Sequence, residues 1–125
     1  MRLLSIAALQ ISPLVDDVEG TVAAFERRVT TLADTFDELQ LVVAPELHLA
    51  AVGGFFDELP GAALERAVDI PGPLTDRLAA LAAATGLWLV PGSLYERAPG
   101  GAVHNTAVVI SRHENAFGGS VRVRP

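Results

Sequence analysis

The sequence predicts an α/β domain in which amphipathic helices cover a sheet. Short apolar runs rich in β-branched residues alternate with two longer segments whose apolar residues recur every three or four positions. The resulting order is strand, helix, strand, helices, strand, strand, which is typical of helices packed on sheets. The chain has 125 residues, of which 50% are hydrophobic, and this suits one domain with a packed core.

Composition excludes several classes of function. The formal net charge is −6 and the basic residues are scattered, which argues against a nucleic-acid partner. The longest apolar runs are much shorter than a membrane span, and the N-terminus lacks the pattern of a cleaved signal. We therefore expect a soluble, cytoplasmic protein with no membrane partner. All 9 basic residues are arginine and there is no cysteine, so these residues supply neither a thiol nor an amine nucleophile.

The first elements are a strand over residues 3–10 and a helix that follows it. No glycine-rich turn comes after the strand, which argues against a dinucleotide-binding unit. Acidic residues at 16, 17 and 19 occupy the expected first helical turn, where the helix dipole favours negative charge. Spacings of four and three residues then predict about five turns that cover the sheet, with apolar positions at Val18, Val22, Phe25, Val29 and Leu32.

A second strand over residues 39–46 is the candidate centre of a site. Its apolar run predicts a strand buried on both faces, which Pro45 ends and Glu46 follows. Binding and catalytic groups collect at the carboxyl ends of strands in α/β folds. From these residues alone Glu46 is equally well interpreted as a half-exposed carboxylate in a salt bridge or as a functional group.

The segment after Glu46 contains His48 and then paired glycines and phenylalanines at 53–56, which suggest a loop that closes over something. His48 has no second ligand at metal spacing, so a structural role is favoured and no metal is predicted. A short helix is expected over residues 62–68, followed by a turn at 70–73. A second covering helix over residues 74–85 ends at Gly86.

The remaining strands form the end of the predicted domain. A third strand over residues 87–90 is interrupted by Pro91 and Gly92 and continues over 93–96; a fourth spans 103–111. Residues 112–125 lack a clear period, and 121–125 form an edge strand or no element. We therefore divide the chain into a domain over residues 1–111 and an atypical tail over 112–125.

Several of these segments together resemble one family. The chain is similar, from about Leu3 to Ser111, to the N-terminal half of the nitrilase superfamily, the carbon–nitrogen hydrolases. No single motif decides this, but their order and intervals are specific. The matching segments are Ala8-Leu9-Gln10-Ile11-Ser12-Pro13, Leu41-Val42-Val43-Ala44-Pro45-Glu46, Ile70-Pro71-Gly72-Pro73, Pro91-Gly92-Ser93-Leu94-Tyr95-Glu96 and His104-Asn105-Thr106-Ala107-Val108-Val109-Ile110.

The resemblance implies a four-layer α-β-β-α sandwich, present here as its N-terminal half, and assembly of the full domain into homo-oligomers. It also implies hydrolysis of a nitrile or amide through a Glu-Lys-Cys triad without a cofactor. Glu46 inherits the general-base role, and an apolar cleft would raise its pKa toward the range useful for proton transfer. The cysteine would form a covalent intermediate that water hydrolyses, and the lysine would stabilise the developing charge.

The chain departs from the family pattern after Ser111, because neither the lysine nor the cysteine is present. We therefore predict that this polypeptide is inactive by itself, and that the tail over 112–125 reflects a frameshift or truncation. Nitrile, aliphatic amide, ω-amide and carbamoyl substrates all stay open. Asn105 is expected to be structural and to fix the loop that carries Glu46 or the missing lysine, and Glu96 is expected to be a solvated charge.

Two other functions are compatible with the sequence. The first is a non-catalytic interaction protein, derived from a hydrolase domain and bound to an intact paralogue, which would cover the apolar face that a half sandwich exposes. The second is a small flavodoxin-like ligand-binding domain, which ranks last because no phosphate-binding loop is present.

Overall fold

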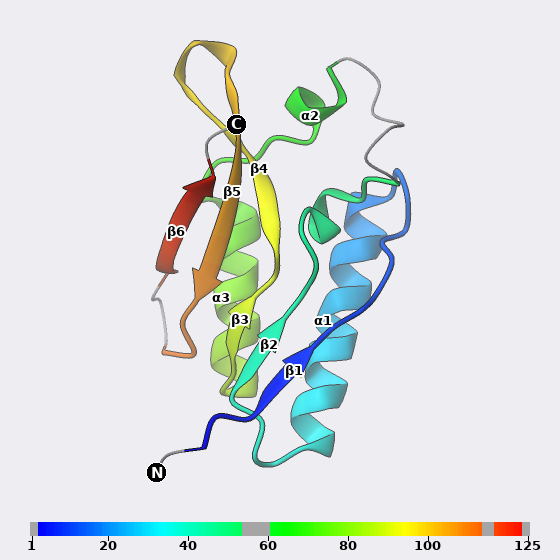
Figure 1. Ribbon diagram of the computed structural model, residues 1–125, viewed down its shortest axis with the longest axis vertical. Coiled ribbons are helices and arrows are strands. Elements are labelled where there is room, and N and C mark those ends of the chain that lie inside the picture. The colour runs from blue at the N-terminus through cyan, green and yellow to red at the C-terminus, as the bar shows by residue number, and fades with distance from the viewer. Residues whose placement is uncertain (1–2, 54–60, 114–116, 124–125) are drawn as a thin grey trace.

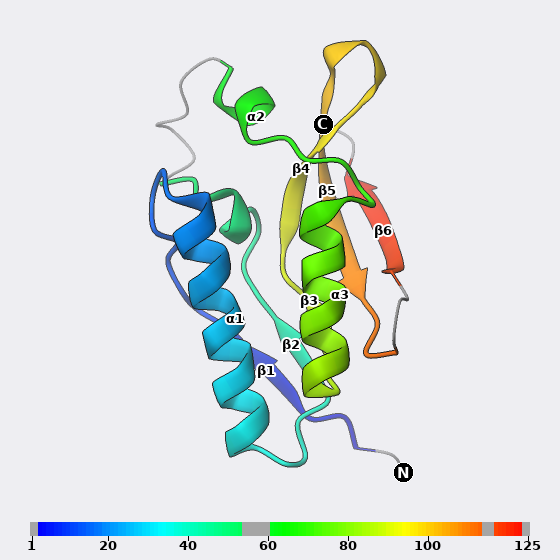
Figure 2. The same ribbon diagram turned by 180° about the vertical axis from the view of Figure 1, so that it is seen from behind.

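A computed structural model of the protein describes residues 3–53, 61–113 and 117–123, with side chains described up to residue 113. One mixed sheet carries two long helices, α1 and α3, on the same side (Figures 1 and 2). The elements in order are β1 Ile6–Ala8, α1 Val18–Thr35, β2 Leu41–Val43, the 3-10 helix η1 His48–Ala50, α2 Ala62–Glu65, α3 Pro73–Thr85, β3 Trp88–Val90, β4 Ser93–Arg97, the 3-10 helix η2 Pro99–Gly101, β5 Val103–Ile110 and β6 Phe117–Val123.

The sheet has 6 strands and combines parallel and antiparallel pairs. β1, β2 and β3 are parallel neighbours, and β5 runs antiparallel to β3, β4 and β6. β3 and β4 lie along the same edge of β5 and are separated only by Pro91 and Gly92, as the sequence predicts. The register changes by one residue across this interruption, from Leu89 opposite Ile110 to Ser93 opposite Ala107.

Both long helices begin and end at residues suited to those positions. Asp17 precedes α1, and its Oδ1 accepts a hydrogen bond of 2.8 Å from the Gly20 N–H. Pro73 occupies the first turn of α3, where its missing N–H costs nothing. Gly86 ends α3 with φ of 69°, a left-handed conformation that glycine adopts without steric cost. The stop predicted at Gly86 is therefore confirmed, and α1 begins at Val18, one residue after the predicted acidic pair.

Ion pairs join the two helices on their outer side. The Arg77 guanidinium of α3 donates from Nε and Nη2 to the two oxygens of Glu26, at 2.6 and 2.7 Å. It also donates from Nη1 to Glu19, at 2.9 Å. Both carboxylates belong to α1 and raise the pKa of Arg77 further, so this side chain stays charged. The planar guanidinium thereby fixes the orientation of α3 relative to α1.

The hydrophobic core lies between the helices and one face of the sheet. Val22, Phe25 and Val29 of α1 are buried, as their spacing predicts, and pack against sheet residues such as Leu89. Along β5 the side chains alternate between buried and half-buried, with Thr106, Val108 and Ile110 completely buried. This alternation shows that one face of β5 is covered more fully than the other, whereas β4 is buried on both faces from Ser93 to Glu96.

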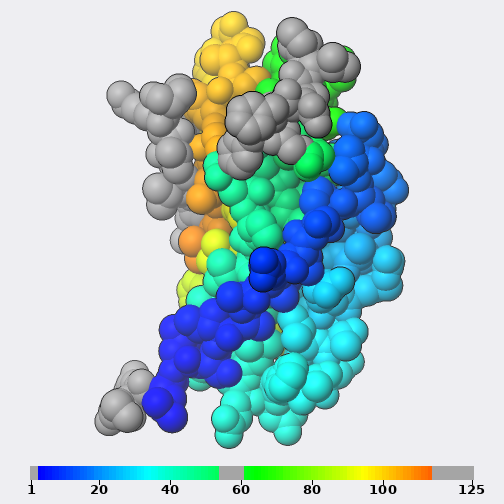
Figure 3. Space-filling view, turned by 45° about the vertical axis from the view of Figure 1, so that its right-hand side comes forward, coloured from blue at the N-terminus to red at the C-terminus, as the bar shows by residue number. Residues whose placement is uncertain are grey.

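On the face of the sheet opposite α1 and α3, the burial predicted for residues 39–46 was wrong. Residues 39–46 were expected to form a strand buried on both faces, but in β2 only Val42 is buried, whereas Leu41 and Val43 are half-buried. Ile6 of β1 is 51% exposed. Figure 3 shows the N-terminal strand running across the surface of the molecule. Over β1, β2 and β3 the described helices cover only one face, so the apolar run of β2 is continuous while its burial alternates. Over β4 the short helices η1 and α2 lie on the other face, where Tyr95 is buried.

The predicted elements are all present, although most are shorter. β1 has 3 residues and α2 has 4, where longer segments were expected. The boundary proposed at residue 111 stays a prediction; beyond it, the backbone of β6 pairs with β5 from Phe117 to Val123. Within the described part of the chain, no helix has the length and apolar character needed to cross a membrane.

Candidate active site

Glu46 lies just beyond the carboxyl end of β2, at the position that the sequence predicts. Hydrogen bonds tie the chain on either side of it to β3 and β4: the Ala44 N–H donates to Val90 O at 2.8 Å, and the Leu47 N–H donates to Ser93 Oγ at 3.2 Å. The backbone around Glu46 is therefore attached to the interrupted strand next to it.

The interruption between β3 and β4 lets the two segments approach closely. Gly92 has φ of 90°, and a Cβ atom built on it would lie 2.0 Å from the carbonyl oxygen of Pro45. No side chain fits at that distance. Gly92 therefore allows the Pro45–Glu46 segment to rest directly on the strand break, and this contact sets the position of the Glu46 backbone.

Asn105 of β5 contacts the Glu46 carboxylate directly. Its Nδ2 donates to Glu46 Oε1 at 2.7 Å across 59 residues of sequence. This arrangement agrees with the expectation that Asn105 fixes the segment carrying Glu46. It brings a carboxylate and an amide together at one end of the sheet, where the amide can orient the carboxylate for proton transfer.

The surroundings of Glu46 differ from the apolar cleft that was expected. Its side chain is exposed among the described residues. The carboxylate is therefore placed and oriented but not enclosed. Its role as a general base stays a prediction.

His48, two residues after Glu46, does not join this group. Its side chain is buried, with 4% exposed, and its ring lies 6.3 Å from the ring of Phe25 on α1. Burial, followed by the charge of Arg28, lowers the pKa of His48 below its usual 6.5. The structural role favoured from the sequence is supported, because the neutral imidazole packs in the core.

The lowered pKa of His48 predicts a loss of stability in mild acid. The unfolded chain takes up this proton below about pH 6.5, whereas the folded chain resists it, so the contribution is complete above pH 6.5 and is lost as the pH falls toward the folded pKa. We expect the urea midpoint to drop between pH 7.5 and 5 in the wild type, and to drop less in His48→Gln. Parallel pH curves for the two proteins would contradict this assignment.

A second polar group was misjudged from the sequence. Glu96 was expected to be a solvated charge at a strand end, but only 4% of it is exposed. Thr106 Oγ1 donates to its Oε2 at 2.6 Å, and His104 Nδ1 lies 4.0 Å from the same oxygen. Cross-strand pairing of β4 with β5 brings these residues together. All four residues from Ser93 to Glu96 are buried, so alternation along β4 carries no signal for Glu96.

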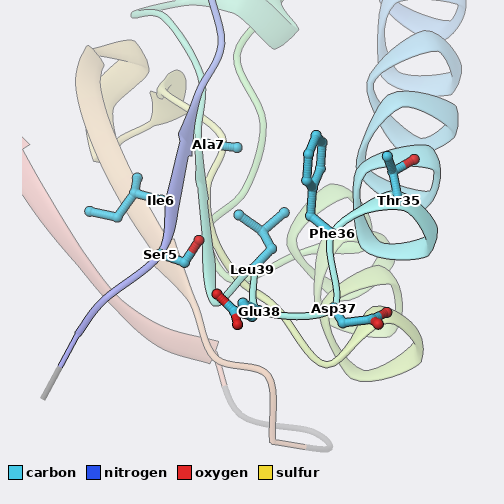
Figure 4. A pocket seen from close by; sticks show the side chains of 8 residues that line it. All are labelled: Ser5, Ile6, Ala7, Thr35, Phe36, Asp37, Glu38 and Leu39. Atoms are coloured by element: carbon cyan, nitrogen blue, oxygen red, sulfur yellow. The ribbon is translucent and has the colours of Figure 1, made fainter.

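Other candidate sites receive little support. No group of three potential ligands occurs among the described residues that could hold a metal ion. The glycines and phenylalanines proposed to form a closing loop at 54–56 lie outside the described residues. A pocket of about 560 Å³ lies at the opposite end of the sheet from Glu46 (Figure 4). There Phe36 and Ala7 point into the gap between β1 and α1, while Ile6 points away.

Comparisons with known proteins agree on one family. Residues 5–123 match the family described as carbon-nitrogen hydrolase. Nit3 from Saccharomyces cerevisiae, a member of branch 10 of the nitrilase superfamily, is 17% identical with a TM-score of 0.78. A carbon-nitrogen hydrolase from Helicobacter pylori G27 is 20% identical with a TM-score of 0.80, and an amidase from Nesterenkonia sp. is 20% identical with a TM-score of 0.69. A search of curated protein sequences found no match.

The match covers most of this chain but less than half of each solved structure. The three alignments include 95% of this chain, and 43%, 39% and 42% of the yeast, Helicobacter and Nesterenkonia chains. At these identities the likeness concerns the fold. The chain accordingly has the fold of one part of a nitrilase-type domain.

Proposed function

Because the chain belongs to the carbon-nitrogen hydrolase family, we propose that it is the part of such an enzyme that carries the general base, Glu46. The observation that carries the proposal is the position of this carboxylate: it follows the second parallel strand, its backbone rests on Gly92, and Asn105 holds its Oε1. In the complete active site it would remove the proton from a thiol and later from water. The bond cleaved is the C–N bond of a nitrile or amide.

The nucleophile in this proposal is a cysteine thiolate. In a mutant of the Nesterenkonia amidase the acetamide moiety of fluoroacetamide is covalently attached at the active site cysteine. Attack on an amide carbon would give a thioester with loss of ammonia, whereas addition to a nitrile carbon would give a thioimidate. One water would convert the thioimidate to the thioester with loss of ammonia, and a further water would release the acid and the thiol. A lysine would stabilise the anion that develops in the tetrahedral intermediate.

The 125 residues contain neither a cysteine nor a lysine. We therefore propose that this polypeptide does not hydrolyse amides or nitriles alone. Incubation of the purified chain with an aliphatic amide, an ω-amide, a carbamoyl compound and a nitrile should release no ammonia and no acid above the buffer blank. Turnover abolished by Glu46→Gln would show that a different nucleophile completes the site.

A chimera tests the role of Glu46 itself. Residues 5–110 would replace the matching segment of the Helicobacter pylori carbon-nitrogen hydrolase, which then supplies the rest of the domain. We expect amide hydrolysis by this chimera and a loss of about 10²- to 10⁴-fold in kcat on Glu46→Gln, the usual range for removing a general base.

The matched control for this experiment is Glu38→Gln. Glu38 is also an exposed glutamate, but it lies before β2, at the other end of the sheet. This variant should retain the activity of the parent chimera. Equal kcat values for the Glu46→Gln and Glu38→Gln chimeras would refute the assignment of Glu46 as the base.

The uncovered sheet face favours a second candidate function, a non-catalytic interaction protein. Half-buried apolar residues such as Val43 and Val90, together with exposed Ile6, leave a face that a partner could cover. Such a partner would be an intact relative or a second copy of this chain. Size-exclusion chromatography and hydrogen exchange on the purified protein distinguish an interaction module from a fragment. A stable monomer or homo-oligomer with protected amides supports the module, whereas aggregation or low protection supports an incomplete domain.

A further inference from the structure

The amide of Asn105 is held more firmly than the carboxylate that it contacts. Asn105 lies inside β5, opposite Tyr95 of β4 on one side and Val123 of β6 on the other. A strand with neighbours on both sides moves little, because each backbone group is engaged in the ladder. Glu46, in contrast, is an exposed side chain with several rotatable bonds at a strand end.

Asparagine is an unfavourable residue for stability at position 105 of β5. β-Branched residues suit a half-buried strand position better than asparagine. The Oδ1 atom of Asn105 is also buried without a hydrogen-bond partner among the described residues. An unsatisfied buried carbonyl destabilises the folded state, so the fold alone does not explain the asparagine. The Asn105 side chain does donate the 2.7 Å hydrogen bond to Glu46.

We propose that Asn105 is a positioning residue for Glu46, an inference that rests on the function proposed above. By donating to Oε1, the amide restricts the rotation of the carboxylate, and the proton taken from the nucleophile then goes to Oε2. The backbone contact at Gly92 positions the main chain of Glu46, and the hydrogen bond from the Asn105 amide positions its carboxylate. A base held in this way is ready for proton transfer without further ordering.

Nuclear magnetic resonance on the 125-residue chain tests the contact without any need for turnover. The side-chain NH₂ signals of Asn105 should move with pH as Glu46 takes up its proton, and Glu46→Gln should abolish that movement. In Asn105→Ala the order parameter of the Glu46 side chain should fall well below its wild-type value.

The control for lost packing is Val109→Ala. Val109 is half-buried on the same face of the same strand, and it is four residues from Asn105. This variant should lose stability but leave the order parameter of Glu46 unchanged. Asn105→Leu, which has a similar shape but no hydrogen-bond donor, should behave like Asn105→Ala and serves if the alanine variant does not fold.

Two results would overturn the proposal. The first is a position of the Asn105 NH₂ signals that depends on pH in the same way in the wild type and in Glu46→Gln. The second is a Glu46 order parameter that stays high in both Asn105 variants, or falls equally in Val109→Ala. In the active chimera, Asn105→Ala should lower kcat by about 10- to 100-fold with less change in KM. An inactive chimera would speak against the proposed function and leave the resonance measurements as the test of positioning.

Discussion

Replacing Gly92 with alanine should destabilise the protein by about 3 kcal/mol and displace Glu46. An alanine at φ of 90° pays about 1–2 kcal/mol for the left-handed conformation. Its Cβ would also lie 2.0 Å from Pro45 O, so the backbone on one side of the contact must shift. Such overpacking typically costs a further 1–3 kcal/mol. Urea unfolding, followed by the fluorescence of the single tryptophan, Trp88, measures the change.

The matched control, Gly101→Ala, separates the cost of the close contact with Pro45 from the cost of the left-handed backbone conformation. Gly101 has φ of 80°, but nothing lies within 4 Å of a Cβ atom built there. Gly101→Ala should therefore cost only the conformational part, about 1 kcal/mol. In the active chimera Gly92→Ala should also lower kcat, whereas Gly101→Ala should not. Equal destabilisation by the two substitutions would show that the approach of Pro45 to Gly92 is not what constrains this segment.

A charge at Val42 should unfold the chain. Val42 of β2 is completely buried in the core between the sheet and the helices. An aspartate there loses its hydration without gaining a partner, which costs more than about 4 kcal/mol. Since small domains are stable by only about 5–15 kcal/mol, we expect Val42→Asp to be largely unfolded or to melt far below the wild type. Circular dichroism and urea unfolding would record this.

Val43→Asp makes the same change one residue later, on the opposite face of β2. Val43 is half-buried because the described residues place no layer over it. In the isolated chain we expect a loss within about 1 kcal/mol, since the carboxylate can reach water. A large loss, accompanied by dissociation of an oligomer, would instead show that another chain covers this face, and would favour the interaction protein.

The sequence carries local information well, which is why most elements were correctly predicted. The 3.6-residue spacing of Val22, Phe25 and Val29 specifies which side of α1 is buried. Pro73 and Gly86 mark the ends of α3 because their backbone preferences act within one turn. Pro91 and Gly92 mark the strand interruption for the same reason. The order of motifs also indicates the family, which the match over residues 5–123 confirms.

The carbon–nitrogen hydrolase family, the α/β order and the position of Glu46 after a strand were thus determined by the sequence itself. Only the tertiary structure decided which faces are covered, and therefore that Val42 is buried while Glu46 is exposed. It also decided that Asn105 reaches Glu46, and that Glu96 is buried against Thr106. The physical reason is that periodicity reports the direction of a side chain along its own element, whereas burial and hydrogen-bond partners depend on segments distant in sequence that the sheet brings together.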